Sequence, residues 1–425
     1  MKSLTAALAT LTLAAGCVGS PQTSPAGGDR SMGVGPITLA TGKVATEYLQ
    51  PLLDQWNATH PNERAKLLEL PEATDDQRAQ MVNNLRVKSD RYDVLNLDVV
   101  WTAEFADAGW IIPLNRGDFP LDRFLPPVVD TALFRGQLYA VPYTSNAGLL
   151  YYRKDILDKE KKSPPKTWAE LRDLAMTVAP KYKMGGYAGQ FQSYEGLTVN
   201  FAEAVQSAGG AILTNNGTDV VVNSPQARAG LNFLVGGFRE GWIPKAALGY
   251  KEEESRREFE AGHLLFLRNW PYVYGAFDQA GAGNAVQGRF GVVTLPGSDA
   301  SHPGSSSLGG ANLAISSYSK HQKSALEFIR YLTSLPTQRR VLTDGSFPPV
   351  WASLYDDPAL IKKYPYLPVL KESILAARPR PQSPNYNQVS LIVSNAVYGA
   401  LALQDSTEVA ITKMDADLKG AIVNR

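Results

Sequence analysis

Short apolar runs rich in β-branched residues alternate with longer segments of helical periodicity along this chain, and this alternation constrains the fold more than any other feature. Strands are predicted at residues 37–39, 92–97, 138–142, 149–152, 264–267, 290–295 and 312–315. Between them lie segments whose apolar residues recur at helical spacing. Alternating strands and helices are typical of an α/β fold, so we predict that class.

Three helices can be placed from local signals. Apolar residues at helical spacing predict one amphipathic helix, and these residues are Tyr48, Leu49, Leu52, Leu53 and Trp56. Pro51 lies among them, so we expect it in the first turn, where a helix tolerates proline. Thr167 followed by Glu170 is typical of a capping box at a helix start. A third helix is predicted over residues 324–333, with Ala325, Phe328, Ile329 and Leu332 on one face.

Size and charge limit the classes of function. With 425 residues and 44% hydrophobic content, the chain can bury the cores of two lobes. Its 42 basic and 41 acidic residues leave a net charge of +1, which does not favour nucleic-acid binding. We find no repeat of 20–50 residues and no heptad seam, so a solenoid is not expected.

The amino terminus has the pattern of an export signal. Met1-Lys2 is followed by an apolar run over residues 4–15 that is too short to span a bilayer. The run ends in small residues and Cys17, which is the only cysteine, and this arrangement resembles a bacterial lipobox, although Leu13 lies one place further upstream than usual. We therefore predict a lipoprotein signal over residues 1–17 with lipidation at Cys17; the alternative is an ordinary signal peptide that removes Cys17. Residues 18–35 are rich in Gly, Ser and Pro and are predicted to form a flexible tether.

Several segments resemble the sugar-binding proteins of ABC importers, the cluster that includes the maltose-type binders. The resemblance extends along the chain after the tether and is carried by residues 93–101 (DVLNLDVVW), 108–114 (AGWIIPL), 136–142 (GQLYAVP), 149–155 (LLYYRKD), 165–168 (PKTW) and 207–210 (SAGG). Residues 97–106 (LDVVWTAEFA), 269–271 (NWP) and 380–386 (RPQSPNY) are similar to actinobacterial lipoproteins that capture trehalose. The resemblance implies an α-linked disaccharide as ligand, with other α-glucosides as alternatives.

The resemblance also implies a two-lobed periplasmic-binding-protein-like fold with a ligand cleft between the lobes. We assign residues 36–145 plus 310–350 to the amino-terminal lobe and 146–309 plus 351–425 to the other. The chain would cross between them near residues 144–148, 308–312 and 347–351. Closure would then be a hinge motion.

A sugar site needs planar hydrogen-bonding groups and an aromatic platform. Asp98 follows a predicted strand, where a carboxylate can accept from two hydroxyls, or it can cap the helix that follows. The resemblance implies that Asn146 bridges ligand and lobe, although a turn asparagine is the alternative. It implies a ligand carboxylate among Glu252, Glu253 and Glu254, with Glu252 or Glu253 favoured; an acidic helix start is the alternative.

Further residues complete the predicted site. Trp270 resembles the family's stacking tryptophan, while Trp56, Trp101, Trp110, Trp168, Trp242 and Trp351 are predicted to belong to the core or a lobe interface. Tyr194 and Glu195 lie in a loop expected to face the cleft. Gly310, after Gly309, can bring backbone amides close to the ligand or form a bare turn. Arg380 is expected to reach the ligand, with Arg378 as the alternative.

An enzyme is the main rival interpretation. Asp98 and one acid of residues 252–254 could form the carboxylate pair of a secreted glycosidase. The sequence has no GxSxG, HExxH or P-loop motif, and His60, His263, His302 and His321 lack metal-ligand spacing. We therefore expect a binding protein without a cofactor, metal or enzymatic activity. It would act as an extracytoplasmic monomer, anchored to the membrane by its lipid, that delivers sugar to ABC permease subunits and their ATPase.

Overall fold

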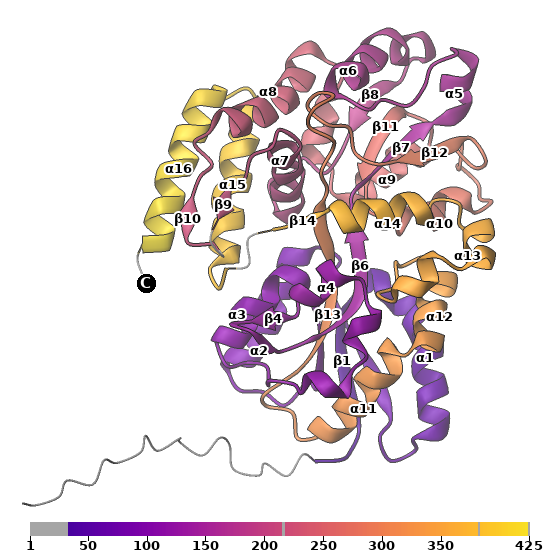
Figure 1. Ribbon diagram of the computed structural model, residues 1–425, viewed down its shortest axis with the longest axis vertical. Helices are drawn as coiled ribbons and strands as arrows, with labels where there is room; N and C mark the ends of the chain where they lie inside the picture. The colour runs from indigo at the N-terminus through magenta and orange to yellow at the C-terminus, as the bar shows by residue number, and fades with distance from the viewer. Residues whose placement is uncertain (1–32, 215–216, 381–382, 424–425) are drawn as a thin grey trace, which may run out of the picture. The chain divides into compact units, whose positions relative to one another are not determined.

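The computed structural model describes residues 33–214, 217–380 and 383–423. The predicted signal segment, Cys17 and the predicted tether up to residue 32 lie outside the described residues. Two principal β-sheets flanked by helices make up most of the described part (Figure 1). The predicted α/β class is therefore confirmed.

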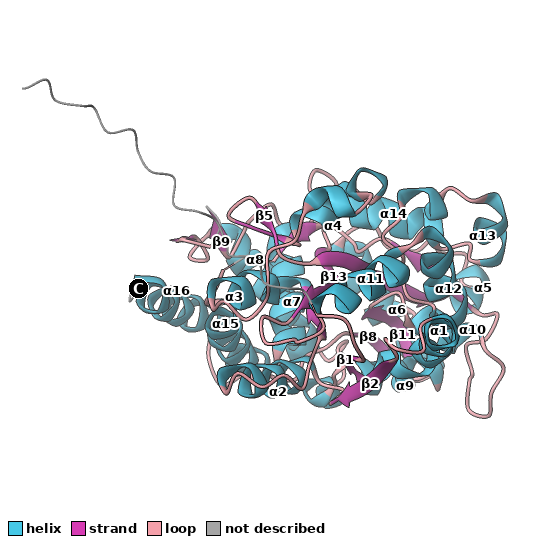
Figure 2. Ribbon diagram, turned by 90° about the horizontal axis from the view of Figure 1, so that it is seen from below, coloured by secondary structure: helices cyan, strands magenta, loops and turns pink. Residues whose placement is uncertain are grey.

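The first principal sheet has six strands. Its order is β14-β13-β3-β1-β2, with β6 also paired to β13. The strands are β1 (Ile37–Gly42), β2 (Ala65–Leu70), β3 (Val94–Asp98), β6 (Val141–Ala147), β13 (Ser307–Ile315) and β14 (Arg378–Pro379). β1 runs parallel to β2 and β3, whereas β13 runs antiparallel to β3 and β6. Helices surround these strands when they are seen from below (Figure 2).

The second principal sheet has four strands in the order β12-β7-β11-β8. They are β7 (Leu149–Arg153), β8 (Gly185–Ala188), β11 (Leu264–Asn269) and β12 (Phe290–Val293). All six residues of β11 are buried, which fits a central strand covered on both faces. The short strands β4 (Leu133–Phe134) with β5 (Gln137–Leu138), and β9 (Leu213–Thr214) with β10 (Asp219–Val220), form separate pairs.

Helices pack on both sheets and supply much of the core. Their bounds are α1 (Thr46–Thr59), α2 (Thr74–Arg86), α3 (Thr102–Asp107), α4 (Pro126–Asp130), α5 (Lys154–Lys159), α6 (Trp168–Thr177), α7 (Glu195–Ser207), α8 (Pro225–Glu240), α9 (Glu252–Glu260), α10 (Val273–Asp278), α11 (Gln322–Thr333), α12 (Leu335–Gly345), α13 (Pro358–Lys363), α14 (Leu367–Ala376), α15 (Tyr386–Leu401) and α16 (Thr407–Val423). The predicted capping box is confirmed, since Thr167 Oγ1 accepts from the Glu170 amide at 3.3 Å and Glu170 accepts from the Thr167 amide. The helix predicted at 324–333 is α11.

The chain passes between the sheets through paired strands, and this excludes the turn alternatives at two predicted site positions. β6 leads through Gly148 into β7 of the other sheet, and β13 pairs with β6 in a register that places Gly309 opposite Asn146. The turn interpretations of Asn146 and of Gly309-Gly310 are therefore wrong, because both segments are held by a hydrogen-bonded ladder. The predicted strand at 312–315 starts earlier, at Ser307, for the same reason.

Two other local predictions also need correction. Pro51 lies inside α1, which begins at Thr46, and not in its first turn. The buried side chains Leu49, Leu52 and Leu53 offset the backbone hydrogen bond that proline cannot donate. The strand predicted at 138–142 is interrupted, since β5 ends at Leu138 and β6 begins at Val141.

Candidate sugar-binding cleft

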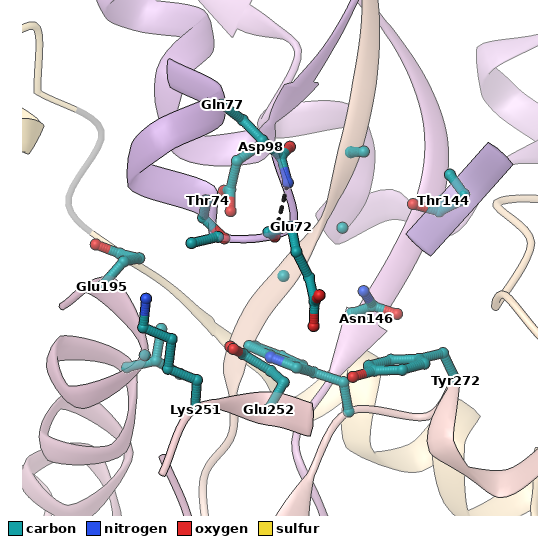
Figure 3. A pocket seen from close by; sticks show the side chains of 18 of the residues that line it. Glu72, Thr74, Gln77, Asp98, Thr144, Asn146, Glu195, Lys251, Glu252 and Tyr272 are labelled. Carbon is teal, nitrogen blue, oxygen red and sulfur yellow. Dashed lines mark hydrogen bonds between the residues drawn. The ribbon is translucent and has the colours of Figure 1, made fainter. Parts of the chain in front are cut away.

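A cavity of about 500 Å³ lies between elements of the two principal sheets (Figure 3). Its walls come from β3, β6, β13 and α2 on one side and from α7, α9 and the end of β11 on the other. Seven of the eight predicted ligand residues line it: Asp98, Asn146, Glu252, Glu253, Trp270, Gly310 and Arg380. Residues from distant parts of the sequence thus converge on one space.

Arg380 joins carboxylates from two separate elements at one wall. Its Nη2 donates to Asp98 Oδ1 at 2.7 Å, and its Nη1 donates to Glu195 Oε1 at 2.5 Å. Asp98 also accepts from the amide of Val100 at 3.1 Å, so it caps the short turn after β3 while its side chain lines the cavity. The capping and cavity positions proposed for Asp98 are therefore compatible.

Glu195 is the most buried carboxylate of this network. Its side chain is 8% exposed and also accepts from Tyr386 at 2.7 Å and from the Ser390 hydroxyl. Burial raises the pKa of Glu195, and the charge of Arg380 opposes that rise. Glu195 lines the cavity, although its oxygens are already engaged by protein donors.

The three acids at the start of α9 all line the cavity, and each has a protein partner. Tyr194 donates to Glu252 Oε2 at 2.6 Å, and Tyr272 donates to Glu253 Oε1 at 2.6 Å. Burial raises the pKa of Glu252, while the hydrogen bond from Tyr194 lowers it. Tyr194 itself does not line the cavity, so its contact is with Glu252.

Two amide residues line the cavity, and each has a buried side-chain oxygen without a hydrogen-bond partner. Asn96, on β3, donates to Thr41, while its Oδ1 is buried without a hydrogen-bond partner. Asn146 Oδ1 is also buried and unpartnered. A buried acceptor without a donor is uncommon in a folded protein.

The backbone at Gly310 approaches its neighbour more closely than a side chain would allow. Its φ is +123°, and an added Cβ would lie 2.2 Å from the carbonyl oxygen of Thr144. Gly310 is therefore a structural requirement of the β6–β13 crossing as well as a cavity residue.

Trp270 lines the cavity, and neighbouring groups contact its ring and its backbone. The guanidinium carbon of Arg268 is 4.0 Å from the centroid of its ring, and Trp270 N donates to Asn269 Oδ1 at 2.7 Å. Trp101 was predicted to be a core or interface residue; it is 4% exposed and also lines the cavity. The remaining tryptophans pack in or against the core: Trp56, Trp110, Trp168, Trp242 and Trp351.

Carboxylates outnumber cations around the cavity. Its carboxylates are Glu72, Asp76, Asp98, Glu195, Glu252, Glu253 and Glu254. Its cations are Lys251 and Arg380. The site therefore disfavours an anionic ligand on Coulomb grounds.

Several lining residues were not predicted from the sequence. Glu72 lies between β2 and α2, and Gln77 lies in the first turns of α2; Gln77 Nε2 donates to the carbonyl oxygen of Glu72 at 3.0 Å. Glu72 extends toward the space between Asn146 and Glu252 (Figure 3). Thr144 lies two residues before the predicted Asn146, so the alternation of β6 was a signal that could have identified it.

A second cavity, of about 370 Å³, distinguishes the positions of Arg378 and Arg380. Arg378 lines only this second cavity, whereas Arg380 lines both. Arg378 donates to the carbonyl oxygen of Gly210 at 3.5 Å. Of the two candidates, Arg380 is thus the one that faces the larger cavity.

Two other kinds of feature are absent from the described residues. Over 33–214, 217–380 and 383–423, no group of three or more His, Cys, Asp or Glu side chains is arranged to hold a metal ion. In the same part of the chain, no helix combines the length and the apolar character needed to cross a membrane.

Known proteins with similar sequences and structures share this fold. Residues 42–339 match the family model of bacterial extracellular solute-binding proteins. A probable ABC transporter-binding protein of Deinococcus radiodurans is 33% identical over 380 residues, covering 86% of this chain and 88% of the relative. A maltotriose-binding protein of Pyrococcus abyssi is 25% identical over 298 residues, covering 68% and 61% respectively. The structure of maltose-bound MalE3 of T. maritima superposes with a TM-score of 0.86 at 32% identity, covering 91% of this chain and 99% of that one.

The chain belongs to the family of bacterial extracellular solute-binding proteins. Its fold is the two-lobed fold of periplasmic binding proteins. The cavity between the two sheets therefore occupies the position of a cleft between lobes.

Proposed function

We propose that this protein is the substrate-binding subunit of an ABC importer and captures an α-linked disaccharide in its cleft, with trehalose as the first candidate and related α-glucosides as alternatives. In this proposal residues 36–145 plus 310–350 form one lobe, and 146–309 plus 351–425 form the other. The protein is a monomer that holds its ligand by hydrogen bonds and stacking, without a cofactor. It delivers the sugar to permease subunits driven by an ATPase.

The convergence of Asp98, Glu252 and Trp270 on one cavity carries this proposal. Sugar hydroxyls can donate to the carboxylates of Asp98 and Glu252, and the ring of Trp270 offers an aromatic face. A neutral, hydroxyl-rich ligand therefore matches the groups that line the cavity.

Cavity size, charge and relatives agree with that ligand class. A volume of about 500 Å³ lies within the usual range of small-molecule sites. The excess of carboxylates favours a neutral sugar over a sugar phosphate or uronate. The maltose-bound T. maritima structure and the maltotriose-binding relative support a glucose-based oligosaccharide.

We further propose that the protein works outside the cytoplasm and is held at the membrane by a lipid on Cys17. The support is the export-signal pattern before Cys17 and the extracellular family to which the chain belongs. The Gly-, Ser- and Pro-rich residues 18–35 would then let the folded body reach the permease.

A thermal-shift screen across trehalose, maltose, sucrose and maltotriose tests the proposed function. A ligand that binds only the folded state raises the melting temperature, by an amount that grows with ligand concentration. We expect trehalose or another α-glucoside to raise it, and the recovered sugar to be intact by chromatography. Hydrolysed sugar would instead support the glycosidase interpretation, and no shift with any of the four would contradict sugar capture.

A further inference from the structure

A buried ion pair lies behind the cleft, outside the set of groups that line it. Arg268, near the end of β11, donates from Nε and Nη2 to Glu203 of α7 at 2.7 and 2.6 Å. The two side chains are only 1% and 5% exposed. Because desolvation offsets most of the attraction in such a pair, stability alone is a weak reason for its presence.

Arg268, one member of this pair, contacts the ring of Trp270. The Arg268 guanidinium covers the ring at 4.0 Å, in the geometry of a cation–π contact. The ring also lies against β13, because an added Cβ at Gly309 would be 2.9 Å from it. Tyr151 donates to the Trp270 carbonyl oxygen at 3.1 Å and fixes the backbone. The ring is thus set between a buried cation and a crossing strand, and it still lines the cavity.

Glu203, the other member of the pair, is hydrogen-bonded to residues near which the chain crosses between the sheets. Glu203 Oε1 accepts from Ser306 Oγ and from the Ser307 amide, both at 3.2 Å. Ser306 Oγ in turn accepts from the amide of Gly148. Ser307 is the first residue of β13, and Gly148 separates β6 from β7. The β6–β7 crossing and the start of β13 therefore meet at one carboxylate.

We propose that the Arg268–Glu203 pair is a positioning element that fixes the Trp270 ring relative to the crossing strands β6 and β13. A sugar that stacks on the Trp270 ring then contacts a side chain whose position is fixed relative to β6 and β13, where the chain crosses between the lobes. This inference rests on the proposed function for its ligand. Neither Arg268 nor Glu203 needs to touch the sugar, and both act through Trp270.

The first test measures the ring directly and needs no sugar. The protein is labelled with 5-fluorotryptophan, and the ¹⁹F resonance of Trp270 is assigned by its loss in Trp270→Phe. The paired variant Arg268→Met/Glu203→Gln removes both charges at similar volume, so it leaves no buried unpaired ion. We expect the Trp270 resonance to shift or broaden in this variant. An unchanged resonance would overturn the positioning role, whether or not any sugar binds.

The second test measures affinity as a double-mutant cycle. Arg268→Met/Glu203→Gln should weaken binding of the best sugar about tenfold, whereas the same pair of changes in a Trp270→Ala background should weaken it by less than about twofold. Equal losses in both backgrounds, or no loss in either, would contradict action through the ring. Failure of the wild-type protein to bind any sugar would instead count against the proposed function.

A matched control and a milder variant complete the design. Arg153 and Asp155 form another two-bond pair, with distances of 2.8 and 2.6 Å, and neither lines the cavity. Arg153→Met/Asp155→Asn should leave the Trp270 resonance and the affinity unchanged. If Arg268→Met/Glu203→Gln does not fold, Arg268→Lys keeps the charge but loses the planar contact, and it should still shift the resonance. An unmoved resonance in that variant overturns the proposal.

Discussion

Removal of the Arg380 guanidinium should make the stability of this protein depend on pH in a defined direction. Arg380 is 2% exposed at its side chain and is the cation that bonds both Asp98 and Glu195. In Arg380→Met the buried Glu195 keeps only its hydroxyl donors, Tyr386 and Ser390. The pKa of Glu195, already raised by burial, should therefore rise further because the charge that opposed the rise is gone.

The size of the effect follows from the burial of this pair. Breaking a buried ion pair by removing one partner costs about 3–5 kcal/mol, because the other charge stays buried and unpaired. Protonation of Glu195 removes the buried charge and so avoids most of that cost. The remaining cost is the loss of the hydrogen bonds from Arg380, about 1–3 kcal/mol. A carboxyl whose folded-state pKa is raised gives stability that is full below its unfolded pKa, about 4.3, and is lost as the pH rises through the folded pKa. The variant should thus lose stability, relative to wild type, as the pH rises from about 4.3 through the folded-state pKa of Glu195.

Urea unfolding followed by circular dichroism at pH 5, 6, 7 and 8 measures this difference. The second-site variant Arg380→Met/Glu195→Gln replaces the carboxylate by a neutral amide, so it should abolish the extra pH slope and recover part of the stability. A loss in Arg380→Met that is the same at every pH would refute the reasoning. So would a pH slope that persists when Glu195 is replaced.

Three further predictions concern anchoring, motion and packing. Mass spectrometry of the native protein should find a mature terminus at lipidated Cys17, and Cys17→Ala should release the protein; a later terminus, or release that does not depend on Cys17, contradicts this. The radius of gyration from small-angle scattering should fall on saturation with the true ligand, and an unchanged value counts against a hinge. Trp168 stacks on Phe233 with ring centroids 4.6 Å apart and does not line the large cavity. Trp168→Ala should therefore lower the melting temperature and leave the affinity of the folded fraction unchanged, and a large loss of affinity would show that it reaches the site.

The sequence was most informative where function and local structure coincide. Asp98 is the last residue of a short apolar strand, and Trp270 directly follows another. The predicted strands therefore placed both residues at the carboxyl end of a strand. The capping signal of Thr167 and Glu170 is likewise local, and it is confirmed. Such residues are predictable because their neighbours in the chain decide their positions.

Residues placed by packing over long distances were not predictable in the same way. Glu72 reaches the cavity from the segment between β2 and α2, whose place is set by the packing of α2 beside β1 and β2, and no motif near Glu72 indicates that. The partners of Arg380 lie 282 and 185 residues away in the sequence. Asn146 and Gly309 resembled turn residues because asparagine and glycine favour turns, yet pairing of β6 with β13 overrides that preference.

The most direct test of the account is isothermal titration of the wild-type, Asp98→Ala and Trp270→Ala proteins with trehalose or the best α-glucoside. Asp98→Ala removes a charged acceptor from the cavity, a change of about 1.5–3 kcal/mol, or about ten- to a hundred-fold in affinity. Trp270→Ala removes a stacking face and should cost a similar amount. Wild-type affinity in both folded variants would mean that the sugar binds elsewhere.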